Sequence, residues 1–324
     1  MVRKLLLLFG MTGVYLYPTH LISYLVLLFT KIKVSLIMWG LILLCIGLIS
    51  VHLFFNQFFE VVNIFRYYFG FIFFFLFFKS YSFNKELALK LVYILIVMSY
   101  IEFIYINFIG NPYDLNVIRC NDCEQVYSKV AGWYRSYGFS GTSSSSSVII
   151  SIMIFLFFEK KKIIISVIAL LPYLSGAGIF VWLFLVFFNN KNILLKTLFM
   201  FTIALVFFYW GNDLFYKISP EYIKLLFDLK WMAFTESHLL FFGNMQKYIT
   251  GGDFGILGMI NDTGVLGLLL FFFIIIINLS KYNFKYISIL LLASFHYPVV
   301  FFVSGQIILG YLLSCNIKSR CSKL

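Results

Sequence analysis

The sequence predicts an all-α integral membrane protein whose helices carry two large polar loops. Hydrophobic residues make up 62% of its 324 residues and charged residues 12%, whereas soluble domains contain roughly 45–50% and about 25%. Aromatic residues alone account for 21%. Because so few charged side chains cannot cover a water-soluble domain of this size, the composition excludes a soluble enzyme, a secreted disulfide scaffold and a disordered chain.

Apolar segments of membrane-spanning length recur along the chain. A transmembrane helix needs about 17–25 mostly apolar residues, and six segments have this length: 34–55, 58–78, 87–109, 141–158, 193–211 and 263–279. Three longer apolar stretches, 5–30, 163–188 and 286–315, are each interrupted by a proline, namely Pro18, Pro172 or Pro298. Each long stretch is therefore either one tilted helix or a tight pair of short helices.

The basic residues favour the paired arrangement. They lie in short groups between the apolar segments: Lys31/Lys33, Lys79/Lys85/Lys90, Lys160/Lys161/Lys162, Lys191/Lys196, Lys281/Lys285 and Lys318/Arg320/Lys323. If every long stretch crosses the membrane twice, these groups and the N-terminal Arg3/Lys4 all lie on one side, as the positive-inside rule requires. We expect about nine to twelve crossings, both termini in the cytoplasm and an N-terminal segment that acts as an uncleaved anchor.

This topology places two polar loops, 110–140 and 212–262, on the outer face. They contain seven of the 25 basic and nine of the 13 acidic residues, so their net charge is 7 − 9 = −2. Because the net charge of the whole chain is +12, the rest of the chain carries +14. Polar loops on a rigid scaffold are where function usually lies. A nucleic-acid partner is not expected, because no long basic cluster or stripe is present.

The sequence contains no motif for a metal or a nucleotide cofactor. Its four histidines are scattered, and Cys120-x-x-Cys123 has no second pair to complete a zinc site. In an outer loop these cysteines form either a small disulfide or an incidental pair. Neither a phosphate-binding glycine-lysine loop nor a dinucleotide fingerprint occurs, so we expect no cofactor.

Glu60, Arg66 and Glu102 fall within predicted spans, where charge is costly and commonly functional. One interpretation is an ion pair that neutralises itself between helices. The other is the wall of a substrate-binding cavity that opens toward the outer loops.

The end of the first loop combines Arg135 and Gly138 with aromatic neighbours, and the serine-rich run 141–147 follows directly. The hydroxyl groups can cap the N-terminus of the next helix, and small side chains allow helices to approach closely. Arg135 is either an interfacial anchor or a clamp for a diphosphate, whose oxygens fit the planar guanidinium.

The second loop ends in a glycine-rich sequence that contains Gly251-Gly252-Asp253 and Asp262-Thr263-Gly264-Val-Leu-Gly267. This order resembles the bacterial O-antigen polymerase family, in which an Arg-x-x-Gly motif also stands where Arg135 and Gly138 stand here. The hydropathy layout of nearly the whole chain is similar as well. Two positions depart from the family: Ser175-Gly176 replaces a common Ser-Arg pair, and Lys230 stands for an arginine ahead of the glycine-rich turn.

The resemblance implies a multi-pass glycosyltransferase of the bacterial cytoplasmic (inner) membrane that joins undecaprenyl-diphosphate-linked oligosaccharide repeat units at the outer face. A chain-length regulator and the lipid-linked-sugar flippase are the expected partners. Asp253 would activate the acceptor hydroxyl, with His238 and Asp262 as alternatives, and it could also be a mere turn residue. Arg135, helped by Lys230 or Lys247, would steady the departing diphosphate.

Three other functions stay open. The nearest is an O-antigen ligase, although ligases usually carry a histidine where this chain has Asp253. A flippase or other transporter would keep its polar groups near the bilayer midplane and often shows internal repeats, whereas here the polar groups concentrate in outer loops and no duplicated halves are visible. The third is a non-enzymatic scaffold of a cell-envelope complex.

Overall fold

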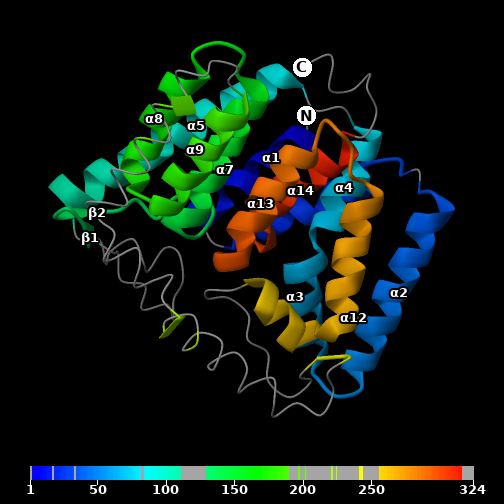
Figure 1. Ribbon diagram of the computed structural model, residues 1–324. Coiled ribbons are helices and arrows are strands. Elements are labelled where there is room, and N and C mark those ends of the chain that lie inside the picture. The colour runs from blue at the N-terminus through cyan, green and yellow to red at the C-terminus, as the bar shows by residue number, and fades with distance from the viewer. Residues whose placement is uncertain are drawn as a thin grey trace.

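The computed structural model describes residues 2–16, 18–32, 34–81, 84–110, 129–189, 196–197, 201, 220–221, 224, 241–243 and 255–315 (Figure 1). Within them the protein is mostly helical with two short strands, which is compatible with the all-α prediction. In chain order the elements are α1 (Val2–Thr12), η1 (Gly13–Leu16), η2 (Thr19–Phe29), α2 (Leu36–Leu53), α3 (Phe58–Phe69), α4 (Phe71–Ser80), α5 (Lys85–Ile104), η3 (Tyr105–Ile109), β1 (Lys129–Val130), β2 (Trp133–Tyr134), α7 (Ser143–Phe157), α8 (Lys162–Leu170), η4 (Leu171–Tyr173), α9 (Gly176–Asn189), α12 (Gly255–Ile277), α13 (Phe284–His296), η5 (Val299–Phe301) and α14 (Val303–Ser314).

Three helices in the described part of the chain are long and apolar enough to cross a membrane. They are Leu36–Leu53, Lys85–Ile109 and Gly258–Ile277, and α3 with α4 makes a fourth if that bent pair is one span. The other apolar helices have 10–17 residues, or roughly 15–25 Å at 1.5 Å per residue, which is less than the ~30 Å hydrocarbon core. The predicted number of nine to twelve crossings is therefore not confirmed.

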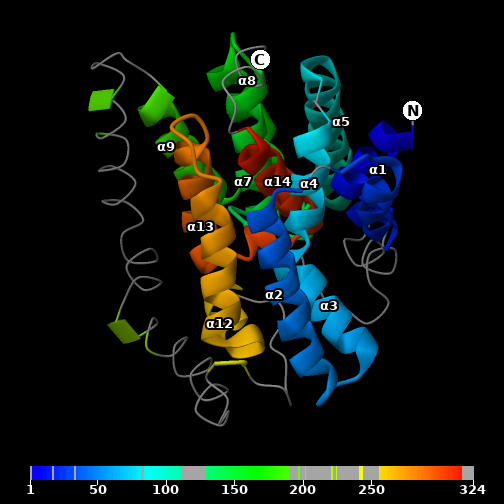
Figure 2. The same ribbon diagram turned by 90° about the vertical axis from the view of Figure 1, so that its right-hand side faces the viewer.

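Helix α2 has the surface expected of a lipid-exposed helix. It lies at the edge of the bundle (Figures 1 and 2), and its outer side chains are large and apolar. Leu36 is 88% exposed, Ile37 64% and Leu43 62%. A soluble protein rarely exposes so much contiguous apolar surface, so this face fits lipid better than water.

The first long apolar stretch forms two short antiparallel helices, as the basic residues predict. A Cβ atom placed at Gly10 of α1 would overlap with Ser23 of η2, and one at Gly13 would overlap with His20. The partner residue number falls as the first number rises, so the chain reverses at the turn around Pro18. Glycine at both positions allows the two helices to touch through their backbones.

The second and third long stretches reverse in the same way. Trp182 of α9 donates to Ser166 of α8 at 2.7 Å, and Asn283 beside α13 donates through Nδ2 to the carbonyl oxygen of Leu312 in α14 at 2.9 Å. The turns lie at the predicted breaks, next to Pro172 and Pro298. We call α1–η2, α8–α9 and α13–α14 the three helical hairpins.

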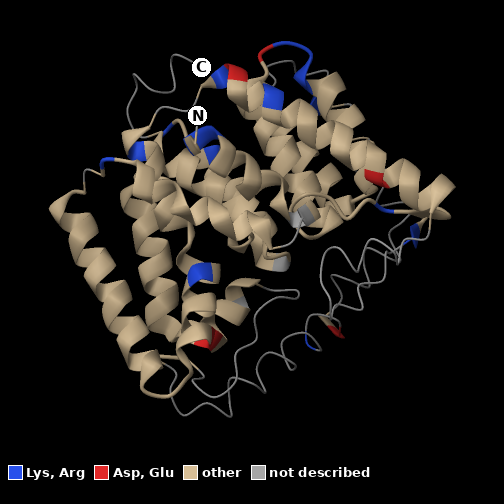
Figure 3. Ribbon diagram, turned by 180° about the vertical axis from the view of Figure 1, so that it is seen from behind, with Lys and Arg blue, Asp and Glu red and all other residues tan. Residues whose placement is uncertain are grey.

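Among the described residues, the reversals bring Arg3, Lys85, Lys162 and Lys285, each from a different basic group, to one end of the molecule (Figure 3). The Arg3 guanidinium lies 5.7 Å from the Tyr81 ring centroid. Across the same end, Lys85 forms an ion pair with Glu159. Lys285 of α13 lies at this end too. It donates to the side chain of Asn189, and burial together with the nearby positive charge of Lys162 lowers its pKa. The common location of these groups agrees with the sequence prediction.

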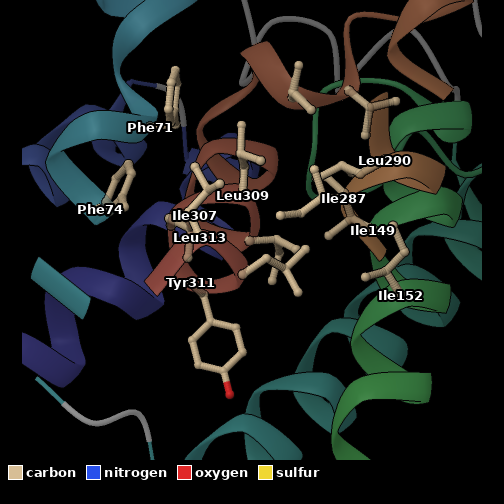
Figure 4. Close-up of a cluster of buried hydrophobic side chains, with 14 of the residues drawn as sticks. Phe71, Phe74, Ile149, Ile152, Ile287, Leu290, Ile307, Leu309, Tyr311 and Leu313 are labelled. Carbon is tan, nitrogen blue, oxygen red and sulfur yellow. The ribbon is translucent and has the colours of Figure 1, made fainter. Parts of the chain in front are cut away.

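Helix α14 lies at the centre of the core. All of its residues from Val303 to Ser314 are buried, although the helix has only 12 residues. Phe71 and Phe74 of α4 lie on one side of it, and side chains of α7 and α13 lie on the other (Figure 4). The helix is therefore surrounded by protein. A helix whose apolar residues lie all around its axis requires such burial.

The predicted span 58–78 is broken in the structure, because α3 and α4 meet at Gly70 with a bend of 54°. Gln306 of α14 lies at this break. Its Nε2 donates to the carbonyl oxygens of Arg66 at 3.0 Å and Tyr67 at 2.7 Å, which are acceptors in the helical ladder. A side chain that inserts into this ladder bends a helix. The sequence did not predict this bend, because a lone glutamine in an apolar stretch does not reveal which carbonyl groups it contacts.

The last long span begins earlier than predicted. We predicted a loop to residue 262 and a span at 263–279, whereas α12 starts at Gly255. Gly264 interrupts it with φ 70°, a left-handed conformation that favours glycine. The predicted span 193–211 lies outside the described residues apart from positions 196, 197 and 201.

Candidate functional site

A short β-hairpin leads the end of the first loop into the helical scaffold. β1 and β2 are antiparallel and turn at Ala131-Gly132, both with positive φ, as a two-residue hairpin requires. Asn107 fixes this hairpin to the π-helical end of α5, since its side chain accepts from Tyr134 N at 2.8 Å and donates to Tyr134 O at 3.0 Å. The chain that follows β2 therefore starts from a fixed point.

Loop 135–138 is wrapped around the carboxylate of Glu102, which lies in the last turn of α5. Oε1 accepts the backbone N–H of Tyr137 at 3.0 Å, and Oε2 accepts that of Gly138 at 3.0 Å. Oε2 also accepts the hydroxyl groups of Ser136 and Tyr15. Glu102 is only 5% exposed, so these four donors replace water around a buried carboxylate.

Gly138 is required by this geometry. Its φ is +80°, a region that residues with a Cβ rarely adopt. A Cβ there would also overlap with Ser146 and with the ring of Tyr173. The Arg-x-x-Gly spacing of the sequence thus corresponds to a loop that turns sharply between the start of α7 and η4.

Arg135 lies beside the second helical hairpin and the N-terminus of α7. Its Nε donates to the carbonyl oxygen of Tyr173 at 3.1 Å, and its Nη2 lies 3.5 Å from Ser144 Oγ. Burial lowers the pKa of the guanidinium, while the nearby Tyr297 raises it. An arginine keeps its charge under such shifts, so the loop presents a fixed cation next to a helix N-terminus.

The serine-rich run has the structural role predicted for it. Thr142 is the N-cap of α7, and its hydroxyl accepts the backbone N–H of Ser145 at 3.1 Å. Ser147 lies so close to Gly178 of α9 that a Cβ at position 178 would overlap with it. The small side chains therefore allow the contact between α7 and the second helical hairpin.

The turns of all three helical hairpins reach this loop. The first contributes Tyr15, which donates to Glu102 at 3.3 Å. The second accepts the backbone N–H of Ser136 on the carbonyl oxygen of Pro172 at 2.8 Å. The third contributes Ser304, which donates to Ser140 at 2.7 Å. Segments far apart in the sequence thus meet at one polar cluster, which we call the Glu102–Arg135 site.

Glu60 and Arg66 do not share that site through any contact the structure describes. Glu60 is exposed in the first turn of α3. The Arg66 guanidinium lies 6.0 Å from the Tyr24 ring centroid, and its buried Nε has no hydrogen-bond partner among the described residues. In this part of the chain Arg66 pairs with neither glutamate, which contradicts the self-neutralising ion pair.

The second predicted motif also folds against its neighbours. Asp262 is fully buried and accepts hydrogen bonds from Tyr68 and Asn261, each at 2.8 Å. The turn 241–243 packs on the break at Gly264, where a Cβ would overlap with the carbonyl of Phe241. The carbonyl of Phe242 in turn lies 2.8 Å from His52 Nε2. The motif glycines permit this close backbone contact.

Four predicted site residues, Lys230, His238, Lys247 and Asp253, lie outside the described residues. Of the others, the structure brings together Arg135, Gly138 and Glu102, and it places Asp262 and Arg66 on other helices. Sequence reasoning missed Tyr15, Ser136, Tyr173 and Gln306. Only Ser136, inside the Arg-Ser-Tyr-Gly motif, carried a signal that could have indicated it.

Comparisons with protein-family models, with curated proteins and with solved structures found no match to this chain. The resemblance to the O-antigen polymerases therefore depends on the motifs and the hydropathy layout of the sequence.

Proposed function

We propose that this chain is a membrane glycosyltransferase that polymerises undecaprenyl-diphosphate-linked oligosaccharide repeat units into an O-antigen or capsular polysaccharide. The reaction would take place at the outer face of the bacterial cytoplasmic membrane. The observation that supports this most is the position of Arg135, which lies beside the N-terminus of α7.

The surroundings of Arg135 suit an anion with several oxygens. A helix N-terminus carries partial positive charge and free N–H groups, and a guanidinium binds phosphate oxygens through two parallel hydrogen bonds. The hydroxyls of Ser143 and Ser144 lie in the first turn of α7 and can donate to the same ligand. A diphosphate is such an anion, and it leaves more readily when its developing charge is stabilised.

The reaction that we propose moves one glycosyl group. The bond between the anomeric carbon of the growing chain and its diphosphate oxygen breaks, and the acceptor hydroxyl oxygen of the next unit bonds to that carbon. A carboxylate removes the hydroxyl proton, and lipid diphosphate departs. We assign removal of the hydroxyl proton to Asp253, with His238 as the alternative. Stabilisation of the departing diphosphate is assigned to Arg135 with Lys230 or Lys247.

The apolar surface supports a lipid-linked substrate. Exposed apolar side chains cover α2, and α5 exposes Val97 at 55% and Ile101 at 64% close to Glu102 in the sequence. A polyprenyl chain can lie along such a surface while its diphosphate reaches the Glu102–Arg135 site. Along the α5 axis Glu102 is 17 residues from Lys85, or about 25 Å, so the site is far from the basic end.

One structural feature favours a second candidate, a transporter of lipid-linked oligosaccharides. Short paired helices that turn inside the protein are typical of transporters, whose substrates bind where such helices break. The three helical hairpins turn at one polar cluster. A transporter would need this cluster to open to both sides of the membrane, whereas a polymerase needs it to open only outward.

The test is a deletion strain of the host complemented with this gene. We expect the deletion to leave single repeat units on the final acceptor, and complementation to restore a ladder of polymer lengths. Polymer stranded on the lipid carrier would identify a ligase instead. Single lipid-linked units that accumulate on the cytoplasmic side would identify the transporter.

A further inference from the structure

We propose that Glu102 is a positioning residue that holds Arg135 at the N-terminus of α7. The inference rests on the proposed function for what Arg135 binds, but not for how the loop is held. The sequence left Glu102 either in an ion pair between helices or at the wall of a substrate cavity, and its contacts point to another role. Both carboxylate oxygens face the loop that carries Arg135 and accept its backbone N–H groups.

The two backbone contacts make a carboxylate necessary. Tyr137 N–H donates to Oε1 and Gly138 N–H donates to Oε2. A glutamine has the same shape, but in either orientation its amide NH₂ faces one of these N–H groups, and two donors cannot bond each other. The hydroxyls of Tyr15 and Ser136 can reverse and accept, whereas a backbone N–H cannot. Glu102→Gln should therefore release one side of the loop.

Arg135 is held on both sides along the chain, and Glu102 supplies the contact on its C-terminal side. Its immediate successor Ser136 donates to Glu102 through Oγ and to Pro172 through its backbone N–H. On the other side Asn107 fixes Tyr134. Arg135 lies between these two anchors, so a change at Glu102 reaches the guanidinium without any contact between Glu102 and a ligand.

Hydrogen exchange tests the anchor independently of activity. In protein reconstituted in lipid nanodiscs, we expect Glu102→Gln to raise the exchange rate of one of the two amides, Tyr137 or Gly138, whichever faces the glutamine NH₂, about tenfold or more, since its hydrogen bond to a charged group is lost. The matched control is Glu86→Gln, the same substitution at an exposed position of the same helix, and it should leave this exchange unchanged. Unchanged exchange in Glu102→Gln would overturn the proposal.

Kinetics then test whether the anchor acts through Arg135. With the lipid-linked repeat unit as substrate, Glu102→Gln should lower kcat/KM about tenfold or more, and Glu102→Asp, which keeps two acceptor oxygens, should lose less. In an Arg135→Lys background the same Glu102→Gln change should cost less than about twofold, because residues that act as a unit are not additive. An equal loss in both backgrounds would mean an independent role and would refute positioning.

Two further measurements separate the possible failures. If the wild-type protein elongates no repeat unit, the proposed function is wrong, and the exchange experiment still decides whether Glu102 holds the loop. If Glu102→Gln does not fold, Ser136→Ala removes a single donor to the same carboxylate and should raise the exchange at Gly138 to a smaller extent. Exchange equal to wild type in Ser136→Ala would then count against the proposal.

Discussion

Tyr68 of α3 donates a hydrogen bond to Asp262 of α12 at 2.8 Å, and the two side chains are 1% and 0% exposed. The bond joins the broken span α3–α4 to the segment before Gly264. An acidic side chain enclosed in this way suits a structural contact between helices better than a general base, which needs access to a substrate proton. Asp262 was an alternative for the base, and its burial makes it a weaker one.

The first prediction concerns this bond. Tyr68→Phe removes one donor from a buried carboxylate and should lower the free energy of unfolding by about 1–3 kcal/mol, with the lower part of that range typical of membrane helices. Unfolding in mixed micelles measures it. Tyr93→Phe is the control, because Tyr93 is 52% exposed and packs only its ring against Phe158. Equal stability of both variants would show that the bond contributes nothing.

The second prediction concerns the bend at Gly70. A Cβ at Gly70 would overlap with the side-chain oxygen of Gln306, so Gly70→Ala should displace Gln306 from the α3 carbonyls and destabilise the protein by about 1–3 kcal/mol. Gly40→Ala in α2 is the matched control, since a Cβ there meets nothing within 4 Å. That change should be neutral or stabilising by up to about 1 kcal/mol. The same unfolding assay compares them, and a stabilised Gly70→Ala protein would remove Gln306 as the cause of the bend.

The sequence predicted what depends on composition and charge placement. The breaks at Pro172 and Pro298 produced paired helices, and the basic groups that the structure describes gathered at one end, because both patterns are local and repeat along the chain. The lengths of the individual helices were not predictable from hydropathy. A buried helix such as α14 is as apolar as a lipid-exposed one, and only its neighbours distinguish the two.

The candidate site was predictable in part. Arg135 and Gly138 were found from their motif, and the capping role of the 141–147 run was found from its hydroxyl groups. The role of Glu102 was not, since its donors come from residues 15 and 136–138 and a contact over 87 residues leaves no local pattern. Gln306 was missed for the same reason.

The third prediction concerns the helical hairpins and their orientation. In a variant without the five native cysteines, single cysteines at Ala131 and Lys160 should behave oppositely toward an impermeant reagent. Both positions are exposed. We expect labelling of intact cells at position 131 and not at 160, because basic groups stay in the cytoplasm. The reverse result would invert the topology and move the Glu102–Arg135 site to the inner face.

A cysteine at Pro18 extends the same experiment to the depth of the first helical hairpin. Pro18 is exposed at its turn. α1 has 11 residues, or about 16 Å at 1.5 Å per residue, and the 3₁₀ helix η2 has 11 residues, or about 22 Å at 2.0 Å per residue. Both are shorter than the ~30 Å hydrocarbon core, so the hairpin is too short to cross the membrane twice. We therefore expect no labelling at position 18 from outside. Labelling there would restore the full double crossing that the sequence predicted.

The fourth prediction separates polymerase from ligase and concerns Asp253. Asp253→Asn keeps the size and turn preference of the residue but cannot accept a proton at neutral pH. In the complemented deletion strain we expect single repeat units in place of the ladder. A full ladder would reduce Asp253 to a turn residue, and polymer stranded on its lipid carrier would make the protein a ligase.

The fifth prediction concerns the charge and the shape of Arg135. Arg135→Ala should abolish the polymer at unchanged protein level, because it removes the guanidinium that we propose binds the diphosphate. Arg135→Lys should restore the ladder only in part. An ammonium keeps the attraction to a diphosphate but not the two parallel hydrogen bonds, so a roughly 10- to 100-fold loss of rate is expected. If lysine restores full activity, a point charge suffices and the diphosphate is not clamped. If alanine gives a wild-type ladder, Arg135 is an interfacial anchor, and the anion site must lie elsewhere.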